Sequence, residues 1–174
     1  MGQAIKKNKV EYIDKVHGNS KGWITRSCID ENGYSQWHYK YLELKETDLT
    51  GENIYITLNT FYKPCRRLEC IKELNFVYID LDYYKTKYTK EQVIMNLESN
   101  YFNKIIPATN YIIDSGRGLA LLWNINKVPS QALPLWKAIQ EYLYHQLKEF
   151  GADRQALDAT RVLRVPGSIN SKSK

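Results

Sequence analysis

Two aspartates, Asp80 and Asp82, stand at the end of the apolar stretch NFVYIDLDYY, residues 75–84. The β-branched, aromatic and aliphatic residues at 76–81 predict a central strand, on which side chains alternate between two faces. Both carboxylates would then project from one face, opposite Val77. Crowding two negative charges costs free energy unless a cation lies between them, and a divalent metal with oxygen ligands supplies one. The alternative is turn chemistry, because Asp also caps turns.

A second candidate motif is SGRG, within the segment DSGRGLALLW. Gly116 and Gly118 lack side chains, so the backbone N–H groups of this turn can approach an oxyanion. Ser115 and Arg117 would add a hydroxyl and a guanidinium donor. The motif is therefore a candidate phosphate site, although glycine-rich hairpin turns are common without any ligand.

Acidic and basic residues also combine near the end of the chain, in LDATRVLRVPGSINSKSK. Asp158 is a further carboxylate. Arg161 and Arg164 are three residues apart, a spacing that places both guanidinium groups on one helix face, where they could hold a triphosphate or a strand backbone. Asn170 and Lys172 extend this positive segment. The simpler alternative is a surface ion pair between Asp158 and Arg161, of little energetic value.

The segment NTFYKPCRRL mixes aromatic rings with Lys63, Arg66 and Arg67, directly before the strand that bears the two aspartates. Cationic side chains contact phosphates, and aromatic rings stack on bases. We therefore predict DNA contacts for these three residues. Ordinary exposed charges on a loop after Pro64 are the alternative.

Composition and charge limit the class of protein. A chain of 174 residues can bury one core, and its 43% hydrophobic and 13% aromatic residues exclude a disordered tail. A net charge of +6 favours an anionic partner such as nucleic acid or a nucleotide. Three cysteines and an N-terminus without a signal-peptide core favour a reducing, cytoplasmic setting.

Two further classes of site find little support. Cys65 and Cys70 with His17 or His38 fit no standard zinc spacing. No apolar run approaches the roughly 20 residues that span a bilayer, so no membrane partner is expected.

The elements that would position these residues follow from periodicity and turn signals. DENG at 30–33 predicts the turn of a hairpin. The helix at 89–100 begins with Thr89 and Gln92 in capping-box spacing, and the one at 130–150 ends at Gly151. A Lys-rich, solvated lead-in, in which a helix could start, is expected over about 1–20. Strands are predicted at 22–29, 34–44, 53–58, 76–81, 110–114 and 119–125.

The ordered series YIDLD, SGRGLALLW and LDATRVLRVPGSIN resembles the archaeo-eukaryotic primase (AEP) superfamily. Within it, the likeness is to the primase-polymerase domains of replication proteins from bacterial plasmids, phages and integrative elements. It covers about residues 54–172. It is specific in the order of the motifs and in the RVLRVPGSxN block.

The resemblance implies roles for the acidic residues. The first family motif, two acids on a strand, matches Asp80 and Asp82, which would ligate catalytic Mg²⁺ or Mn²⁺. The third motif, a hydrophobic residue followed by Asp, matches Leu157 and Asp158. Asp153 is the fallback for this third carboxylate.

The second family motif, Ser-x-His or Ser-Gly-x-Gly-x-His, is matched in part, because Ala120 stands at the histidine position. That histidine contacts the phosphates of the incoming nucleotide, so its loss removes a donor. Arg117, which is permanently charged, is the expected substitute. The nucleotide-binding residues implied by the resemblance are Ser115, Gly116, Arg117, Gly118, Arg161, Arg164, Asn170 and Lys172.

The implied fold is α+β, an RRM-like module whose mixed or antiparallel sheet bears the acids, packed on a second small α/β lobe. We expect residues 1–174 to form a single primase-polymerase domain, from the N-terminal part of a longer replication protein. The expected partners are a single-stranded DNA template, NTP or dNTP, and a helicase or DNA-binding domain in the full-length protein.

The implied reaction is two-metal nucleotidyl transfer, by which the domain would act as a DNA-dependent primase or polymerase. Two other functions stay open. Ala120 is compatible with a catalytically weakened initiator module that binds nucleotide or origin DNA. A metal-dependent nuclease is the third possibility, because carboxylates around two metals serve phosphodiester hydrolysis equally well.

Overall fold

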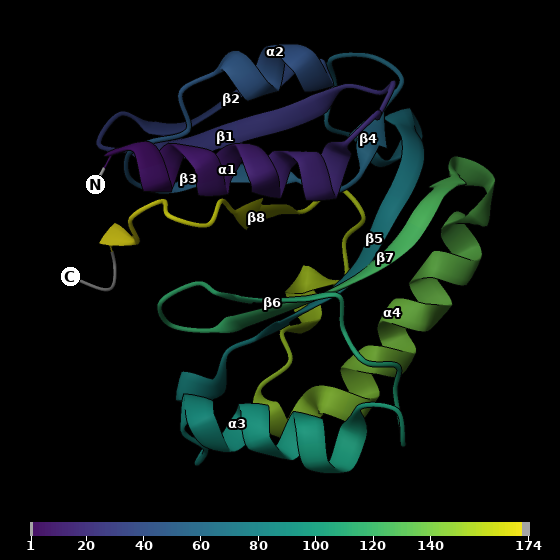
Figure 1. Ribbon diagram of the computed structural model, residues 1–174. Helices are drawn as coiled ribbons and strands as arrows, with labels where there is room; N and C mark the ends of the chain where they lie inside the picture. The colour runs from purple at the N-terminus through teal and green to yellow at the C-terminus, as the bar shows by residue number, and fades with distance from the viewer. Residues whose placement is uncertain (1, 172–174) are drawn as a thin grey trace.

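The computed structural model describes residues 2–171, with side chains described from Val10 onward. Two antiparallel four-stranded sheets lie one above the other in Figure 1, so the architecture is α+β in two lobes, as predicted. The first sheet has the order β2-β1-β3-β8, with β1 Ile24–Asp30, β2 Gly33–Tyr39, β3 Ile54–Thr57 and β8 Val162–Arg164. The second has the order β4-β5-β7-β6, with β4 Thr60–Phe61, β5 Ile71–Leu81, β6 Tyr111–Asp114 and β7 Leu119–Pro129.

β1 and β2 form the predicted hairpin around the turn at 30–33. The strand predicted at 34–44 ends early, because helix α2, Tyr41–Glu46, replaces its second half. On a strand Leu42 and Leu44 would share one face, but Leu44 is fully buried while Leu42 is 70% exposed. The burial of Leu44 therefore favours a helical turn at this position over the strand that the sequence alternation predicts.

The lead-in predicted at 1–20 does start a helix, α1, Gly2–His17, but it is not solvated in its second half, which packs against the first sheet (Figure 1). His17 is fully buried and its Nε2 lies 2.7 Å from the backbone carbonyl of Thr57 in β3, within hydrogen-bond distance. Apolar residues at helical spacing thus anchor a Lys-rich helix. The buried side chains of its last turns are Tyr12, Ile13, Val16 and His17.

The strand predicted to bear the two acids is β5, which begins earlier than expected, at Ile71. Its antiparallel pairing with β7 continues to the end of the strand, where Leu81 lies opposite Leu119. Val77 and Ile79 are buried, as expected for the face opposite Asp80. The central strand of the prediction is therefore confirmed.

One edge of β5 is completed by a helix. β4 pairs only with the beginning of β5. Beyond it, helix α4, Leu133–Leu147, supplies side chains in place of a neighbouring strand. Trp136 Nε1 donates to the carbonyl of Phe76 at 2.8 Å, and Gln140 Oε1 accepts from the N–H of Tyr78 at 3.1 Å. These bonds satisfy backbone groups that would otherwise be buried without partners.

The same edge continues into the segment after α4. The N–H of Asp82 donates to the carbonyl of Gly151 at 2.9 Å, and the N–H of Asp153 donates to the carbonyl of Asp80 at 2.8 Å. Gly151 has a φ of 81°, and a Cβ there would lie 2.7 Å from the Asp82 carbonyl oxygen. The glycine that ends the predicted helix therefore also permits this close approach.

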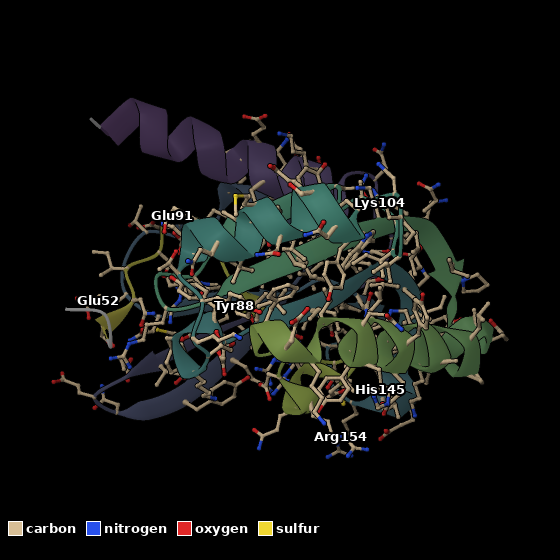
Figure 2. The ribbon with its side chains drawn as sticks, turned by 90° about the horizontal axis from the view of Figure 1, so that it is seen from below. Glu52, Tyr88, Glu91, Lys104, His145 and Arg154 are labelled. Carbon is tan, nitrogen blue, oxygen red and sulfur yellow. The ribbon has the colours of Figure 1, made fainter. Side chains whose placement is uncertain are left out.

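Two helical segments lie along the second sheet, as the view from below shows (Figure 2). The helix predicted at 130–150 is α4 with a 3₁₀ turn at each end, Ser130–Ala132 and Lys148–Phe150. The helix predicted at 89–100 is α3, Lys90–Asn96, continued by a π-helical turn, Leu97–Tyr101. None of the helices in the described part of the chain is both long and apolar enough to cross a bilayer. The other 3₁₀ turns are Leu68–Cys70, Tyr83–Lys85 and Arg154–Ala156.

A buried asparagine joins the two sheets. Asn59 Oδ1 accepts the N–H of Asn75 in β5 at 2.8 Å, and Asn59 Nδ2 donates to the carbonyl of Ala159, shortly before β8, at 2.9 Å. Asn75 Nδ2 donates in turn to the carbonyl of Leu58, after β3, at 2.9 Å. These buried bonds fix the position of the acids on β5 relative to the first sheet.

Candidate active site

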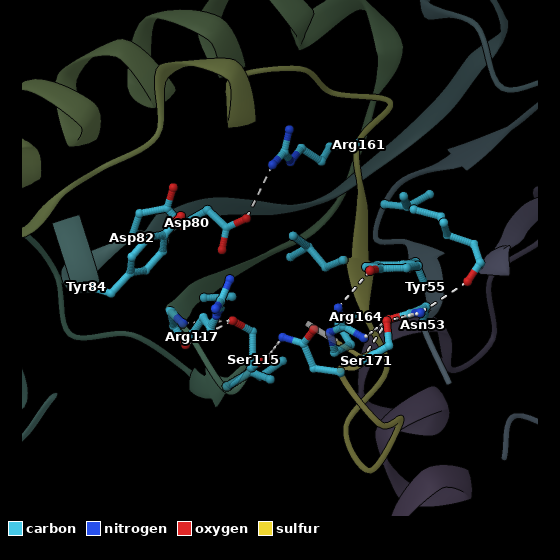
Figure 3. A pocket seen from close by; sticks show the side chains of 17 residues that line it. Asn53, Tyr55, Asp80, Asp82, Tyr84, Ser115, Arg117, Arg161, Arg164 and Ser171 are labelled. Carbon is cyan, nitrogen blue, oxygen red and sulfur yellow. Dashed lines mark hydrogen bonds and ion pairs between the residues drawn. The ribbon is translucent and has the colours of Figure 1, made fainter. Parts of the chain in front are cut away.

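A pocket of about 440 Å³ opens between the two sheets (Figure 3). We call it the central pocket. The ends of β5 and β7, the turn between β6 and β7, and β8 with its flanking residues supply most of its lining. The lining residues whose side chains could take part in binding or catalysis include Tyr55, Asp80, Asp82, Arg117, Arg161 and Arg164.

The two predicted acids both reach this pocket. The Asp80 side chain is 22% exposed and that of Asp82 is 26% exposed. Burial is the largest cause of a raised pKa for Asp80, the Arg161 guanidinium opposes it, and the Asp82 carboxylate adds to it. Lys85 Nζ lies 2.6 Å from Asp82 Oδ2 and partly balances that charge. A divalent cation next to Asp80 and Asp82 would relieve the same repulsion.

Arg161 lies between two carboxylates. Its Nη2 is 3.5 Å from Asp80 Oδ2 and 3.3 Å from Asp153 Oδ2. Asp153 reaches this position because its backbone N–H is bonded to the Asp80 carbonyl. The fallback carboxylate therefore lies across Arg161 from Asp80, although it does not line the central pocket. The ion pairs of Arg161 are thus with these two residues.

The structure does not bring Asp158 to the central pocket. Its Oδ1 accepts hydrogen bonds from the N–H and the hydroxyl of Thr160 at 2.9 and 3.0 Å, which is turn chemistry. Its side chain instead lines a smaller pocket of about 270 Å³, beside Tyr34 and Arg66. For Asp158 to act as the third carboxylate, as the family motif implies, this turn would have to rearrange.

The helix face expected for Arg161 and Arg164 is wrong, because Val162–Arg164 form β8, paired with β3. Arg164 Nη2 donates to the Tyr55 hydroxyl at 2.7 Å, and the guanidinium carbon lies 4.7 Å from the centre of that ring. Arg164 Nη1 donates to Asn53 Oδ1 at 3.2 Å. Arg164 lines the pocket, as predicted, but protein contacts hold it there.

Tyr55 and Asn53 were not singled out from the sequence. Ile54 and Ile56 are buried on one face of β3, so strand alternation already directs Tyr55 to the other face. Asn53 has a φ of 51°, a left-handed conformation for which the sequence carries no specific signal beyond the residue type.

The SGRG turn is closed by its own hydrogen bonds. Gly118 N–H donates to Ser115 Oγ at 3.1 Å, and Gly116 N–H donates to Asp114 Oδ1 at 2.8 Å. The two glycine amides are therefore engaged within the turn, contrary to the expected oxyanion cradle. A Cβ at Gly118 would lie 2.7 Å from the Leu81 carbonyl oxygen, so this glycine permits close packing on the end of β5.

Arg117 is the donor of this turn that stays available. It is exposed, lines the central pocket, and makes no hydrogen bond or ion pair with any residue that the structure describes. In Figure 3, Arg117 and Arg161 lie on opposite sides of Asp80. Asn170 Nδ2 donates to the Ser115 carbonyl at 3.0 Å and so ties the end of the chain to the turn. Lys172 lies outside the described residues.

Ala120 lies directly opposite Asp80 in the pairing of β5 with β7, so the two side chains share one face. It is 4% exposed and lines the central pocket. The position that a histidine occupies in the family motif is therefore next to the acids. In this chain an alanine offers apolar surface there and no donor.

The predicted DNA-contacting residues belong to the segment before β5. Lys63 and Arg67 are exposed. Arg66 bridges the two sheets, because its Nε donates to Gln36 Oε1 at 3.2 Å and its Nη1 donates to the Thr160 carbonyl at 3.0 Å. Arg66 is thus held in place, while the other two cations face solvent.

Metal ligation depends on the acids of the central pocket. Within the described part of the chain, no three His, Cys, Asp or Glu residues are grouped so that they could hold a metal ion. His17 and His38 instead form hydrogen bonds with Thr57 and Thr25. Asp80 and Asp82 still fit one hard divalent cation in donor type, charge and partial burial.

The comparison with solved structures defines the class of fold. The AEP domain of the primase-polymerase of cyanophage S-2L is similar to this chain with a TM-score of 0.64 and 13% sequence identity. The alignment covers 97% of this chain and 85% of that domain. The chain therefore has the same fold as that AEP primase-polymerase domain, as the resemblance of its motifs implies.

The comparison with curated proteins gives one relative of high sequence identity. A replication protein of Clostridium perfringens is 75% identical over all 174 residues, which correspond to 43% of that protein's length. The chain thus spans less than half of its relative. No known family model matches the chain.

Proposed function

We propose that the chain is the primase-polymerase domain of a replication protein, which joins NTPs or dNTPs on a single-stranded DNA template. The observation behind this proposal is the central pocket, which combines Asp80 and Asp82 with the unengaged guanidinium of Arg117. The guanidinium suits a polyphosphate, and the two carboxylates suit the divalent cation that accompanies a nucleotide. The AEP fold of the chain supports the same reaction class.

Asp80 and Asp82 would hold Mg²⁺ or Mn²⁺, which when bound supplies activation of the attacking hydroxyl and neutralisation of the leaving pyrophosphate. Asp153 would be the third carboxylate, because its backbone N–H is bonded to the Asp80 carbonyl and its Oδ2 lies across Arg161 from Asp80. Asp158 would need to leave its turn with Thr160.

Arg117 would bind the triphosphate, in the role that a histidine at position 120 has in the family motif. Arg161, which is paired with Asp80 and Asp153, would contact the phosphates of a bound nucleotide. Ser115 and Asn170 shape the turn that presents Arg117, and Arg164 with Tyr55 forms the opposite rim. A guanidinium positioned in a partly buried pocket stabilises developing charge better than one in water.

More than half of the relative lies outside the part that matches this chain. We propose that residues 1–174 form one domain of a longer replication protein, in which a helicase or DNA-binding domain accompanies the primase-polymerase domain. The 43% coverage of the relative supports the greater length of such a protein.

Templated synthesis tests the proposal. The chain is incubated with a single-stranded template, Mn²⁺ and either NTPs or dNTPs, and products are resolved by length. Asp80→Asn with Asp82→Asn should abolish products while preserving the fold, whereas Glu98→Gln, an exposed acid on the second lobe, should not. Templated products that persist in the double variant would refute the assignment of the acids, and strand breakage without incorporation would indicate a nuclease.

A second candidate, a nucleotide-binding or origin-binding module, is favoured by Ala120 alone. Ala120 is the cross-strand partner of Asp80 and lines the central pocket. The imidazole of Ala120→His would therefore lie beside this acid. Synthesis that appears only in Ala120→His, together with salt-dependent DNA binding by the unaltered chain, would select this candidate. Synthesis by the unaltered chain would select the enzyme.

A further inference from the structure

The smaller pocket beside Asp158, here called the hairpin pocket, adjoins the central pocket. Its volume is about 270 Å³, below the range of pockets that enclose whole drug-sized ligands. It shares Ile29, Tyr55, Arg161 and Val162 with the central pocket, and adds Tyr34, Arg66 and Asp158. The two pockets are therefore adjacent, and Arg161 lines both.

Strand register explains the lining of the hairpin pocket. Ile29 and Tyr34 are direct partners across the β1–β2 hairpin, so their side chains lie next to each other on one face. The pairing of β1 with β3 places Tyr55 on the same face. Ile29 is 47% exposed and Tyr34 is 49% exposed. A tyrosine ring and an isoleucine left half exposed side by side offer the flat apolar surface on which a base stacks.

Positive charge continues from this surface. The Arg66 guanidinium lies 5.8 Å from the centre of the Tyr34 ring, and its bonds to Gln36 and Thr160 hold it there. Lys63 and Arg67, both exposed, extend the cationic surface along the same segment and line neither pocket. A backbone of regularly spaced phosphates matches such an extended series better than a compact triphosphate does.

We propose that the hairpin pocket binds one base of a single-stranded nucleic acid, stacked on Tyr34, with the adjoining phosphates on Arg66, Lys63 and Arg67. The strand then leads into the central pocket past Arg161. A free nucleotide is the weaker occupant, because Arg161 beside this pocket is paired with two carboxylates, whereas Arg117 in the central pocket is unengaged among the described residues. The inference rests on the proposed function for the assignment of the triphosphate to the central pocket.

Strand binding tests this inference without synthesis. Fluorescence anisotropy of a 5′-fluorescein-labelled single-stranded oligonucleotide is measured with the chain in EDTA. Tyr34→Ala should weaken binding by about 5-fold or more, the lower end for loss of one base–aromatic stack, and Tyr34→Phe should stay within about 2-fold. Tyr142→Ala is the matched control, because Tyr142 is 48% exposed but lies on α4. Binding of a fluorescent dATP analogue, measured separately, should not change in Tyr34→Ala.

The opposite results would overturn the inference. Unchanged strand affinity in Tyr34→Ala, or an equal loss in Tyr142→Ala, removes the pocket as a strand site. A loss of dATP-analogue binding with unchanged strand binding makes a free nucleotide the occupant. Tyr34→Leu, which keeps apolar area without a flat ring, should behave like Tyr34→Ala and serves if the alanine variant folds poorly. Absence of primer synthesis would refute the proposed function and leave this binding result standing.

Discussion

Replacing Arg161 is expected to strengthen metal binding and to weaken nucleotide binding. Its guanidinium lies within 3.5 Å of Asp80 and 3.3 Å of Asp153, so a divalent ion that approaches the acids meets a positive charge already in place. Arg161→Gln removes that charge and keeps a hydrogen-bonding side chain. The two ligands should therefore respond in opposite directions.

The size of the effect follows from charge separation and screening. Two unit charges about 4 Å apart interact by roughly 4 kcal/mol at an effective dielectric constant of 20 and by about 1 kcal/mol in water. The Arg161 side chain is 30% exposed and Asp80 is 22% exposed, so solvent screens the pair and the lower figure is the better guide. Since about 1.4 kcal/mol is tenfold in affinity, we expect the Kd for Mn²⁺ to fall by roughly 5- to 10-fold.

The assay is a Mn²⁺ titration of the nucleotide-free chain, followed by the electron paramagnetic resonance signal of the free ion. Arg154→Gln is the control, because Arg154 is exposed, changes the net charge equally and has no ion pair with the acids among the described residues (Figure 2). Binding of a fluorescent dATP analogue is measured on the same variants. Unchanged or weaker Mn²⁺ binding in Arg161→Gln, or the same gain in Arg154→Gln, would refute this account of Arg161.

Three further predictions concern stability. Burial lowers the pKa of His17 from 6.5 to about 4, so between these pH values the unfolded state binds a proton that the folded state does not. The free energy of unfolding, measured by urea titration, should therefore fall by about 2 kcal/mol from pH 7.5 to pH 5. His17→Gln should not show this loss. Asn59→Ala should cost about 1–3 kcal/mol in urea unfolding for each buried group left without its bond, and a smaller loss would show that water replaces the amide. Gly151→Ala should cost about 1–3 kcal/mol, because alanine is strained at a φ of 81°, and an unchanged thermal midpoint would contradict that reason.

Much of the fold follows from local sequence patterns. The β-branched run before Asp80 predicts the central strand, and Gly151 marks the end of the long helix. The burial of helix α1 was underestimated because its lysines cluster near the start of the chain, although its apolar residues fall at helical spacing. Helix α2 was missed because its residues also fit the alternation of the preceding strand, and only tertiary burial of Leu44 decides between the two.

The site shows the same division. Asp80, on β5, and Asp82, directly after it, reach the same pocket because side chains two residues apart on an extended chain share a face, which the sequence alone implies. Whether Asp153 or Asp158 lies near them depends on which backbone groups pair with the edge of β5, a non-local event that leaves no mark in residue type. Arg161 and Arg164 both line the central pocket, but the strand geometry of Arg164 depends on pairing with β3, which the sequence pattern does not reveal.

The bonds of Trp136 and Gln140 to the edge of β5 also prevent other copies of the chain from pairing with this strand. An open strand edge is a template on which another chain adds a strand, the first step towards aggregation. Two side chains of a helix occupy the places that an invading backbone would need. The acidic end of β5 can thus terminate at an open, wet pocket without offering a foreign strand a place to join the sheet.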